Sequence, residues 1–145
     1  MTLAILPLVL EGRSIALVAD HVLEIIGGQP WVPLPKARKE LPGVCAWRGR
    51  AIAVLDIAAL SDGLRPLLPG EIRARTVVAS VGRVTFAVPV DAVQEVCSVD
   101  ETRIAPRRLT EQTFARRELQ IDARTVAPVL DLEALVADFS SGAAV

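Results

Sequence analysis

Two aspartates stand at equivalent places in the two halves of this 145-residue chain, each directly after an apolar run. Asp56 follows AIAVL and Asp131 follows VAPVL. Two carboxylates related by an internal repeat can share a proton and activate water, as in aspartic proteases. Those enzymes need Thr or Ser and then Gly after the aspartate, whereas this chain has Asp-Ile-Ala and Asp-Leu-Glu. We therefore interpret both aspartates as N-caps of short helices, whose unbonded N–H groups and dipole favour a carboxylate.

The other residues with catalytic or metal-binding chemistry form no recognisable set. His21 is the single histidine, and the sequence contains no GxSxG elbow, Walker loop, GxGxxG motif or Cys/His/Asp ligand cluster. We interpret His21 as a solvent-facing residue at a strand end. Cys45 and Cys97 lie in apolar sequence without CxxC spacing, so we expect buried, reduced thiols, with a disulfide as the alternative. The sequence predicts no catalytic residue, no metal and no cofactor.

The stretch CAWRGRA, residues 45 to 51, offers binding chemistry instead. Arg48 and Arg50 flank Gly49, which allows close approach of a partner backbone, and Trp47 places an aromatic face beside a planar cation. Arginine and tryptophan are enriched at the energetic centres of protein interfaces. Two solvated arginines on a surface hairpin would have the same composition. At this point an interface and a solvated loop both remain open.

Charge and hydropathy exclude two classes of partner. Sixteen basic and seventeen acidic residues give a net charge of −1, without the basic excess of a nucleic-acid binder. The apolar opening LAILPLVL, residues 3 to 10, is far shorter than the ~20 residues of a membrane-spanning helix and lacks the basic leader of a signal peptide. We therefore expect a cytoplasmic protein that binds no nucleic acid and does not insert directly into the membrane.

An internal repeat organises the chain. ALVADHVLEI at 16 to 25 aligns with AVPVDAVQEV at 87 to 96, and VLDIAAL at 54 to 60 aligns with VLDLEAL at 129 to 135. Hydrophobic residues make up 52% of the chain but aromatic residues only 3%, so the core must be mainly aliphatic, which favours β-sheet. The length suits one domain or two small lobes.

Each half therefore predicts the same series of elements. Gly12-Arg13 and Gly82-Arg83 mark hairpin turns, and the β-rich runs 51 to 55 and 125 to 130 each lead into a short helix. Three further segments are assigned as a connection (65 to 71), a long proline-rich loop (27 to 43) and a charged loop or short helix (107 to 118). We predict a mainly β protein of two barrels of about five strands each, packed together.

The stretch ELPGVCAWRGRAIAVLDIAAL, residues 40 to 60, resembles the central motif of CheW-like domains. In that motif a proline-rich loop leads into Gly-Val, a short apolar run, Arg-Gly, a hydrophobic strand, and an Asp followed by a short helix. VADHVLEII at 18 to 26 and GRVTFAVPVDAVQEV at 82 to 96 resemble the family's two VxxVxEV strands. The resemblance spans roughly residues 3 to 137.

The resemblance implies a single CheW-like domain over 1 to 145, built of two SH3-like five-stranded β-barrels with a groove between them. We expect one subdomain at about 11 to 64 and a second at about 74 to 130, with the N- and C-terminal segments completing the barrels and a short helix after the last strand of each half. It also implies a non-catalytic adaptor and scaffold in bacterial chemotaxis signal transduction, a two-component system.

The implied partners are the signalling tip of a methyl-accepting chemoreceptor and the regulatory domain of a CheA-type histidine kinase, at cytoplasmic chemosensory arrays. The motif positions carry two sets of site residues onto this chain. The receptor-binding residues would be Arg48, Val22, Glu24 and Val93, and the kinase-binding residues would be Arg50, Ala51 and Ile52.

The chain departs from the family pattern after Arg-Gly, where members usually carry a hydrophobic pair and then a proline. Here the sequence is Arg50-Ala51-Ile52-Ala53, which removes apolar contact area on the kinase side. One alternative is therefore an accessory CheW-like protein that binds receptor or another adaptor without recruiting the kinase normally. The alternative of another class is a small hydrolase with a site between the barrels.

Overall fold

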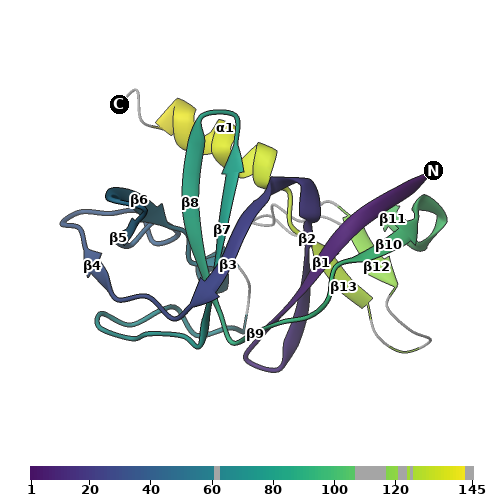
Figure 1. Cartoon of the computed structure of the whole chain (residues 1–145), viewed down its shortest axis with the longest axis horizontal. Coiled ribbons are helices and arrows are strands. Elements are labelled where there is room, and N and C mark those ends of the chain that lie inside the picture. The colour runs from purple at the N-terminus through teal and green to yellow at the C-terminus, as the bar shows by residue number, and fades with distance from the viewer. Residues whose placement is uncertain (61–62, 107–116, 121–123, 125, 143–145) are drawn as a thin grey trace. The chain divides into compact units, whose positions relative to one another are not determined.

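The computed structural model describes residues 1–60, 63–106, 117–120, 124 and 126–142 (Figure 1). Its contacts divide the chain into two compact units, one comprising Met1–His21 with Gln94–Val145 and the other comprising Val22–Val93. We call these unit 1 and unit 2. The mainly β fold predicted from the sequence, with a short helix after the last strand of each half, is confirmed, and its strands form two sheets.

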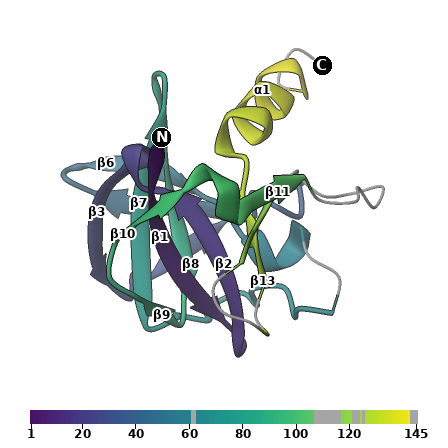
Figure 2. The ribbon, with the colours of Figure 1, turned by 90° about the vertical axis from the view of Figure 1, so that its right-hand side faces the viewer.

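The sheet of unit 1 runs in the order β10-β1-β2-β13-β12-β11. Its strands are β1 (Thr2–Leu10), β2 (Arg13–Val18), β10 (Cys97–Asp100), β11 (Ile104–Pro106), β12 (Arg117–Gln120) and β13 (Val126–Val129). Unit 1 also contains the 3-10 helices η1 (Ala19–His21) and η3 (Glu101–Arg103), and the helix α1 (Leu132–Gly142), which directly follows β13. Strands β1 and β2 lie side by side as a hairpin in both views (Figures 1 and 2).

The sheet of unit 2 runs in the order β3-β7-β8-β6-β5-β4. Its strands are β3 (Val22–Gly27), β4 (Trp31–Pro33), β5 (Gly43–Trp47), β6 (Arg50–Val54), β7 (Arg75–Val81) and β8 (Val84–Val90). The 3-10 helix η2 (Ile57–Leu60) follows β6, and the short strand β9 (Ala92–Val93) follows β8. In the described part of the chain the sheet that contains β1 has seven strands, because β9 also pairs with β1, and the sheet of unit 2 has six, where the sequence predicted about five in each.

The two sheets have one topology, built by exchanging hairpins between the halves of the sequence. The hairpin β1-β2 is completed by β10 to β13, and the hairpin β7-β8 is completed by β3 to β6. In each sheet one strand of the hairpin has an antiparallel outer neighbour: β1 pairs with β10, and β7 pairs with β3. The other strand of the hairpin has a parallel neighbour: β2 pairs with β13, and β8 pairs with β6. The units therefore differ from the subdomains expected at about 11 to 64 and 74 to 130.

The predicted hairpins are present, and their turns explain the glycines. Gly12 and Gly49 have φ of 77°, and each follows a non-glycine residue with positive φ, Glu11 at 50° and Arg48 at 48°. Two successive left-handed residues form the tight turn whose twist matches antiparallel strands. Gly82, with φ of 59°, precedes Arg83 in the turn that joins β7 to β8.

Both sheets bury aliphatic side chains, as the composition predicted. One cluster of buried residues, in unit 2, comprises Trp31, Cys45, Ile52, Val54, Leu67, Val78 and Ala87. A cluster in unit 1 comprises Ile5, Ala16, Val99, Leu119 and Val129. Cys45 is buried, and this burial raises the pKa of its thiol. The expectation that Cys97 is buried is wrong, because this residue begins β10, the outer strand of its sheet, and its side chain is exposed.

Three local predictions need correction or fall outside the described residues. The proline-rich stretch 27 to 43 contains the short strand β4. His21 lies in η1 rather than on a strand, and its side chain is only 20% exposed, with Nε2 3.8 Å from Glu133 Oε1. Of the charged segment 107 to 118, residues 107–116 lie outside the described part, and Arg117 begins β12. Within the described ranges, none of the helices has the length and apolarity to cross a membrane.

Candidate functional site

The tip of the β5–β6 hairpin presents an arginine in a fixed backbone conformation. Trp47 pairs with Arg50 at the ends of the two strands, and Arg48 and Gly49 form the turn between them. The left-handed φ of Arg48 directs the chain sharply back, and its side chain is 69% exposed. An exposed arginine on a tight turn is available to a partner without any opening of the fold.

Arg48 is held by a residue from another strand. Its Nη2 lies 3.0 Å from Oε2 of Glu24, which is on β3. The indole Nε1 of Trp47 donates a hydrogen bond of 3.1 Å to the same oxygen. The guanidinium carbon of Arg48 also lies 5.0 Å from the centre of the Trp47 ring, a cation–π contact. The structure thus brings together the two polar residues of the predicted receptor-binding set.

The two valines of that set lie at half-buried positions of unit 2. Val22 begins β3, the strand that carries Glu24, and the β3–β7 register shifts between these two residues. Val93 ends β9 and is the repeat counterpart of Val22. Their partial burial leaves only part of each side chain able to contact a partner.

The predicted kinase-binding residues are divided between surface and core. Arg50 is exposed, its guanidinium carbon lies 5.5 Å from the Trp47 ring centre, and its Nη2 donates a 3.0 Å hydrogen bond to Thr85 Oγ1. Ala51 is exposed, but Ile52 is only 4% exposed and belongs to the core cluster of unit 2. Ile52 therefore supports the surface from beneath, and its side chain is not available to a partner.

Sequence reasoning left two residues of this surface out of its site set. Trp47 had a usable signal, because an aromatic residue stands next to one arginine and near a second. Thr85 had none, because it lies on β8 and reaches Arg50 only through the parallel pairing of β6 and β8.

Asp56 and Asp131 have the capping role predicted from the sequence. Oδ1 of Asp56 accepts the backbone N–H of Ala58 at 3.2 Å, and Oδ1 of Asp131 accepts that of Ala134 at 3.0 Å. Asp56 makes one bond more, because its Oδ2 accepts the N–H of Leu67 at 2.7 Å. Burial raises the pKa of Asp56, and the two N–H groups and the charge of Arg73 oppose that rise.

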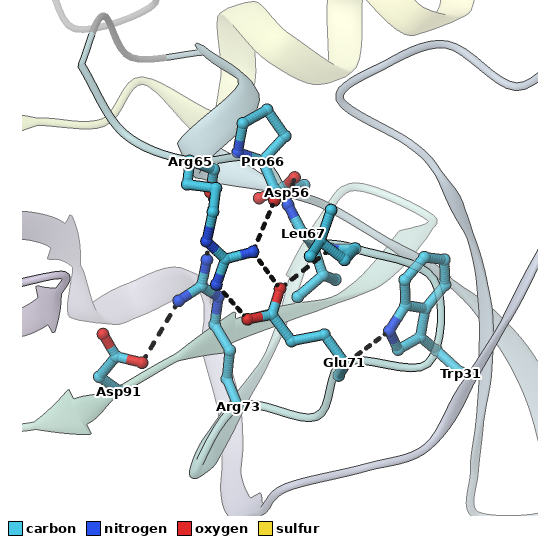
Figure 3. Close-up of polar contacts among 9 residues, drawn as sticks. Trp31, Asp56, Arg65, Pro66, Leu67, Glu71, Arg73 and Asp91 are labelled. Carbon is cyan, nitrogen blue, oxygen red and sulfur yellow. Dashed lines mark hydrogen bonds and ion pairs between the residues drawn. The ribbon is translucent and has the colours of Figure 1, made fainter.

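The connection after η2 is fastened by a polar network around Glu71 (Figure 3). Both carboxylate oxygens of Glu71 bond the guanidinium of Arg65, and its backbone carbonyl accepts the indole N–H of Trp31 at 2.8 Å. The hydrogen bond from Arg65 lowers the pKa of Glu71 to about 2. Arg73 links the same region to Asp91, with 3.3 Å between Nη1 and Oδ1. These contacts hold an irregular segment against its own sheet.

No group of three or more His, Cys, Asp or Glu side chains that could hold a metal ion occurs among the residues the structure describes.

Comparison with known proteins identifies the family of this chain. Residues 5–140 match the family model of the CheW-like domain, so the chain belongs to the family of CheW-like domains. A probable chemotaxis protein CheW from Rhizobium etli is 34% identical over 127 residues, which cover 85% of this chain and 80% of that protein. A chemotaxis protein CheW from Rhizobium meliloti is 31% identical over 112 residues, covering 74% and 71%.

A solved structure has the same fold. The crystal structure of the scaffolding protein TtCheW from Thermoanaerobacter tengcongensis superposes with a TM-score of 0.72 at 20% identity, covering 89% of this chain and 88% of that one. The family is one of chemotaxis coupling adaptors without catalytic activity. The chain is accordingly a chemotaxis adaptor and not an enzyme, which sets aside the hydrolase alternative.

Proposed function

We propose that this adaptor couples the cytoplasmic signalling tip of a chemoreceptor to the regulatory domain of a CheA-type histidine kinase, in chemosensory arrays of the cytoplasm. The observation that carries the proposal is the exposed guanidinium of Arg48, which Glu24 and Trp47 hold at the tip of a tight hairpin. Arg48 also occupies the Arg-Gly position that the family motif links to the receptor.

The chemistry of this surface suits a helical partner with acidic or carbonyl groups. A guanidinium presents five N–H donors in a planar fork, which matches a carboxylate better than an ammonium group does. Glu24 supplies the opposite charge next to it, so the pair favours one register of the partner over others. Val22 and Val93 would add apolar contact from their half-buried positions.

The test is a titration of the folded protein with a receptor signalling fragment. Arg48→Glu should weaken binding by about tenfold or more, since reversing a charge at an interface costs at least ~1.4 kcal/mol. Arg83→Glu is the matched control, because Arg83 is an exposed arginine at another hairpin turn of the same unit. Unchanged receptor affinity in a folded Arg48→Glu variant would contradict the proposal.

A second candidate is an accessory adaptor that binds receptor or another CheW-like adaptor but recruits the kinase poorly. The observation that favours it is the burial of Ile52, which leaves Arg50 and the small Ala51 as the exposed members of the proposed kinase-binding residues. Arg50 is already engaged by Thr85 and Trp47. A titration with the kinase regulatory domain distinguishes the two candidates, because only the coupling adaptor binds it tightly.

A further inference from the structure

The side chain of Trp47 lies where three charged side chains meet. Its indole N–H bonds Glu24 Oε2 at 3.1 Å, and its ring centre lies 5.0 Å from the guanidinium carbon of Arg48 and 5.5 Å from that of Arg50. Glu24 comes from β3, whereas the arginines come from the β5–β6 hairpin. A single aromatic ring thus contacts every charged residue of the surface described above.

The Trp47 ring is fixed by its packing against the core of unit 2. Trp47 is partly buried and packs against the core cluster of unit 2, which includes Cys45 and Ile52. Its N–H group is satisfied by Glu24, so both the apolar and the polar part of the indole have defined partners. Because the indole ring is fixed, its cation–π contact can restrain the guanidinium of a flexible arginine side chain.

This arrangement matters for Arg48 because a long exposed side chain normally samples many rotamers. Arg48 is 69% exposed, and its guanidinium is restrained by the Glu24 carboxylate and the Trp47 ring. The same oxygen of Glu24 accepts from both Trp47 and Arg48, so the indole N–H orients the carboxylate that orients the arginine. A side chain that is already ordered in the free protein loses less conformational entropy on binding, which strengthens association.

We propose that Trp47 is a positioning residue for partner recognition, which holds Glu24 and the guanidinium of Arg48 in one orientation toward an acidic group of the partner. This inference rests on the proposed receptor-binding role of Arg48. In the proposed role, Trp47 acts through Arg48 and makes no essential contact of its own with the partner.

A double-mutant cycle tests the inference. Receptor-fragment affinity is measured for the wild type, Trp47→Leu, Arg48→Ala and the double variant. Trp47→Leu should weaken binding about fivefold, the scale of a lost cation–π contact at an exposed site. In the Arg48→Ala background the same change should have little further effect, because the residue through which it acts is absent. Equal losses in both backgrounds would overturn the inference, since they would mean a direct or a general structural effect.

Side-chain order gives a second readout that needs no receptor. Nuclear magnetic relaxation of the Arg48 Nε–H should show an ordered group in the wild type and a mobile one in Trp47→Leu, with Arg83 unchanged in both. Trp47→Phe keeps a ring but loses the N–H bond to Glu24, so it should lie between them, and it serves as the test variant where Trp47→Leu does not fold. Equal Arg48 order in all three proteins would overturn the inference.

The outcomes separate the inference from the proposed function. If Arg48→Ala binds the receptor fragment like the wild type, the proposed receptor site is wrong and the recognition role of Trp47 falls with it. If Arg48→Ala weakens binding and Trp47→Leu does not, the receptor site stands and only the inference is wrong.

Discussion

Asp56 and Asp131 hold equivalent places in the two halves of the sequence, yet their carboxylates work in different surroundings. Asp56 is 4% exposed and accepts two backbone N–H groups, from Ala58 and Leu67. Asp131 is partly buried and accepts the N–H of Ala134. Asp56 therefore joins a cap to a tertiary contact, because Leu67 lies in the connection beyond η2.

This difference predicts unequal losses of stability. Asp56→Ala should lower the free energy of unfolding by about 3 kcal/mol, because a buried N–H loses its charged acceptor together with the cap. Asp131→Ala should cost about 1 kcal/mol, the usual value of a cap. Urea denaturation of the two variants measures both losses. Equal losses would show that the Leu67 bond adds nothing to the cap.

Glu71 predicts a dependence of stability on pH. The Arg65 hydrogen bond lowers the pKa of Glu71 to about 2, against an ordinary value of 4.5, so the folded state favours the carboxylate. The stabilisation is complete above pH 4.5 and is lost as the pH falls through about 2. The stability difference between the wild type and Glu71→Gln should therefore shrink as the pH is lowered from 5 to 2. A difference that stays constant over this range would rule out the Arg65–Glu71 pair as its source.

At the scale of elements, the antiparallel pairing of β4 with β5 depends on a residue without a side chain. A Cβ at Gly43 would meet the carbonyl oxygen of Val32 and lie 2.8 Å from Cε3 of Trp31. Trp31 is itself buried and bonded to Glu71, so it has little room to move. The Gly-Val of the family motif thus has a packing reason here.

Gly43→Ala should lower the free energy of unfolding by about 2 kcal/mol, the usual scale of an overpacked site. Gly27→Ala is the matched control, because Gly27 is also in a strand but a Cβ there would meet nothing within 4 Å. Gly27→Ala should be close to neutral. Thermal unfolding followed by circular dichroism compares the two variants, and a Gly43→Ala protein as stable as its control would disprove the packing argument.

The hairpins and both caps could be predicted from the sequence because their signals are local. Gly-Arg pairs between apolar runs marked the turns, and an aspartate after each apolar run marked a helix start. Strand β4 was missed because prolines are normally excluded from strands. Leu34 N–H bonds the carbonyl of Pro42, which directly precedes β5, so the backbone of the alternate residue Pro33 points away from β5, where a missing N–H costs the ladder nothing.

The candidate surface was predictable only in part. Arg48 and Arg50 were found from their types and spacing, and Glu24 from the family motif. The burial of Ile52 follows from strand alternation around a core that the sequence alone does not locate. The hydrogen bond from Trp47 to Glu24 joins side chains of β5 and β3. These two strands are far apart in the strand order of the sheet, so nothing in the sequence indicates that the two residues meet.

At the scale of the whole molecule, the exchange of hairpins could not be read from the repeat. The two halves carry the same pattern, so either hairpin suits either set of following strands. The structure pairs β3 with β7 and β1 with β10, and each sheet therefore takes strands from both halves of the chain. Neither half of the sequence contains a complete sheet, so neither half can form its sheet without strands from the other.

The proposed coupling requires one molecule of the adaptor to bind two partners at once. A calorimetric titration of the CheA-type regulatory domain into the protein saturated with a receptor signalling fragment measures whether it does. A coupling adaptor predicts saturable kinase binding while the receptor fragment stays bound. Kinase binding that displaces the receptor fragment would contradict coupling. No kinase binding to the receptor-bound protein would also contradict coupling and would favour the accessory adaptor.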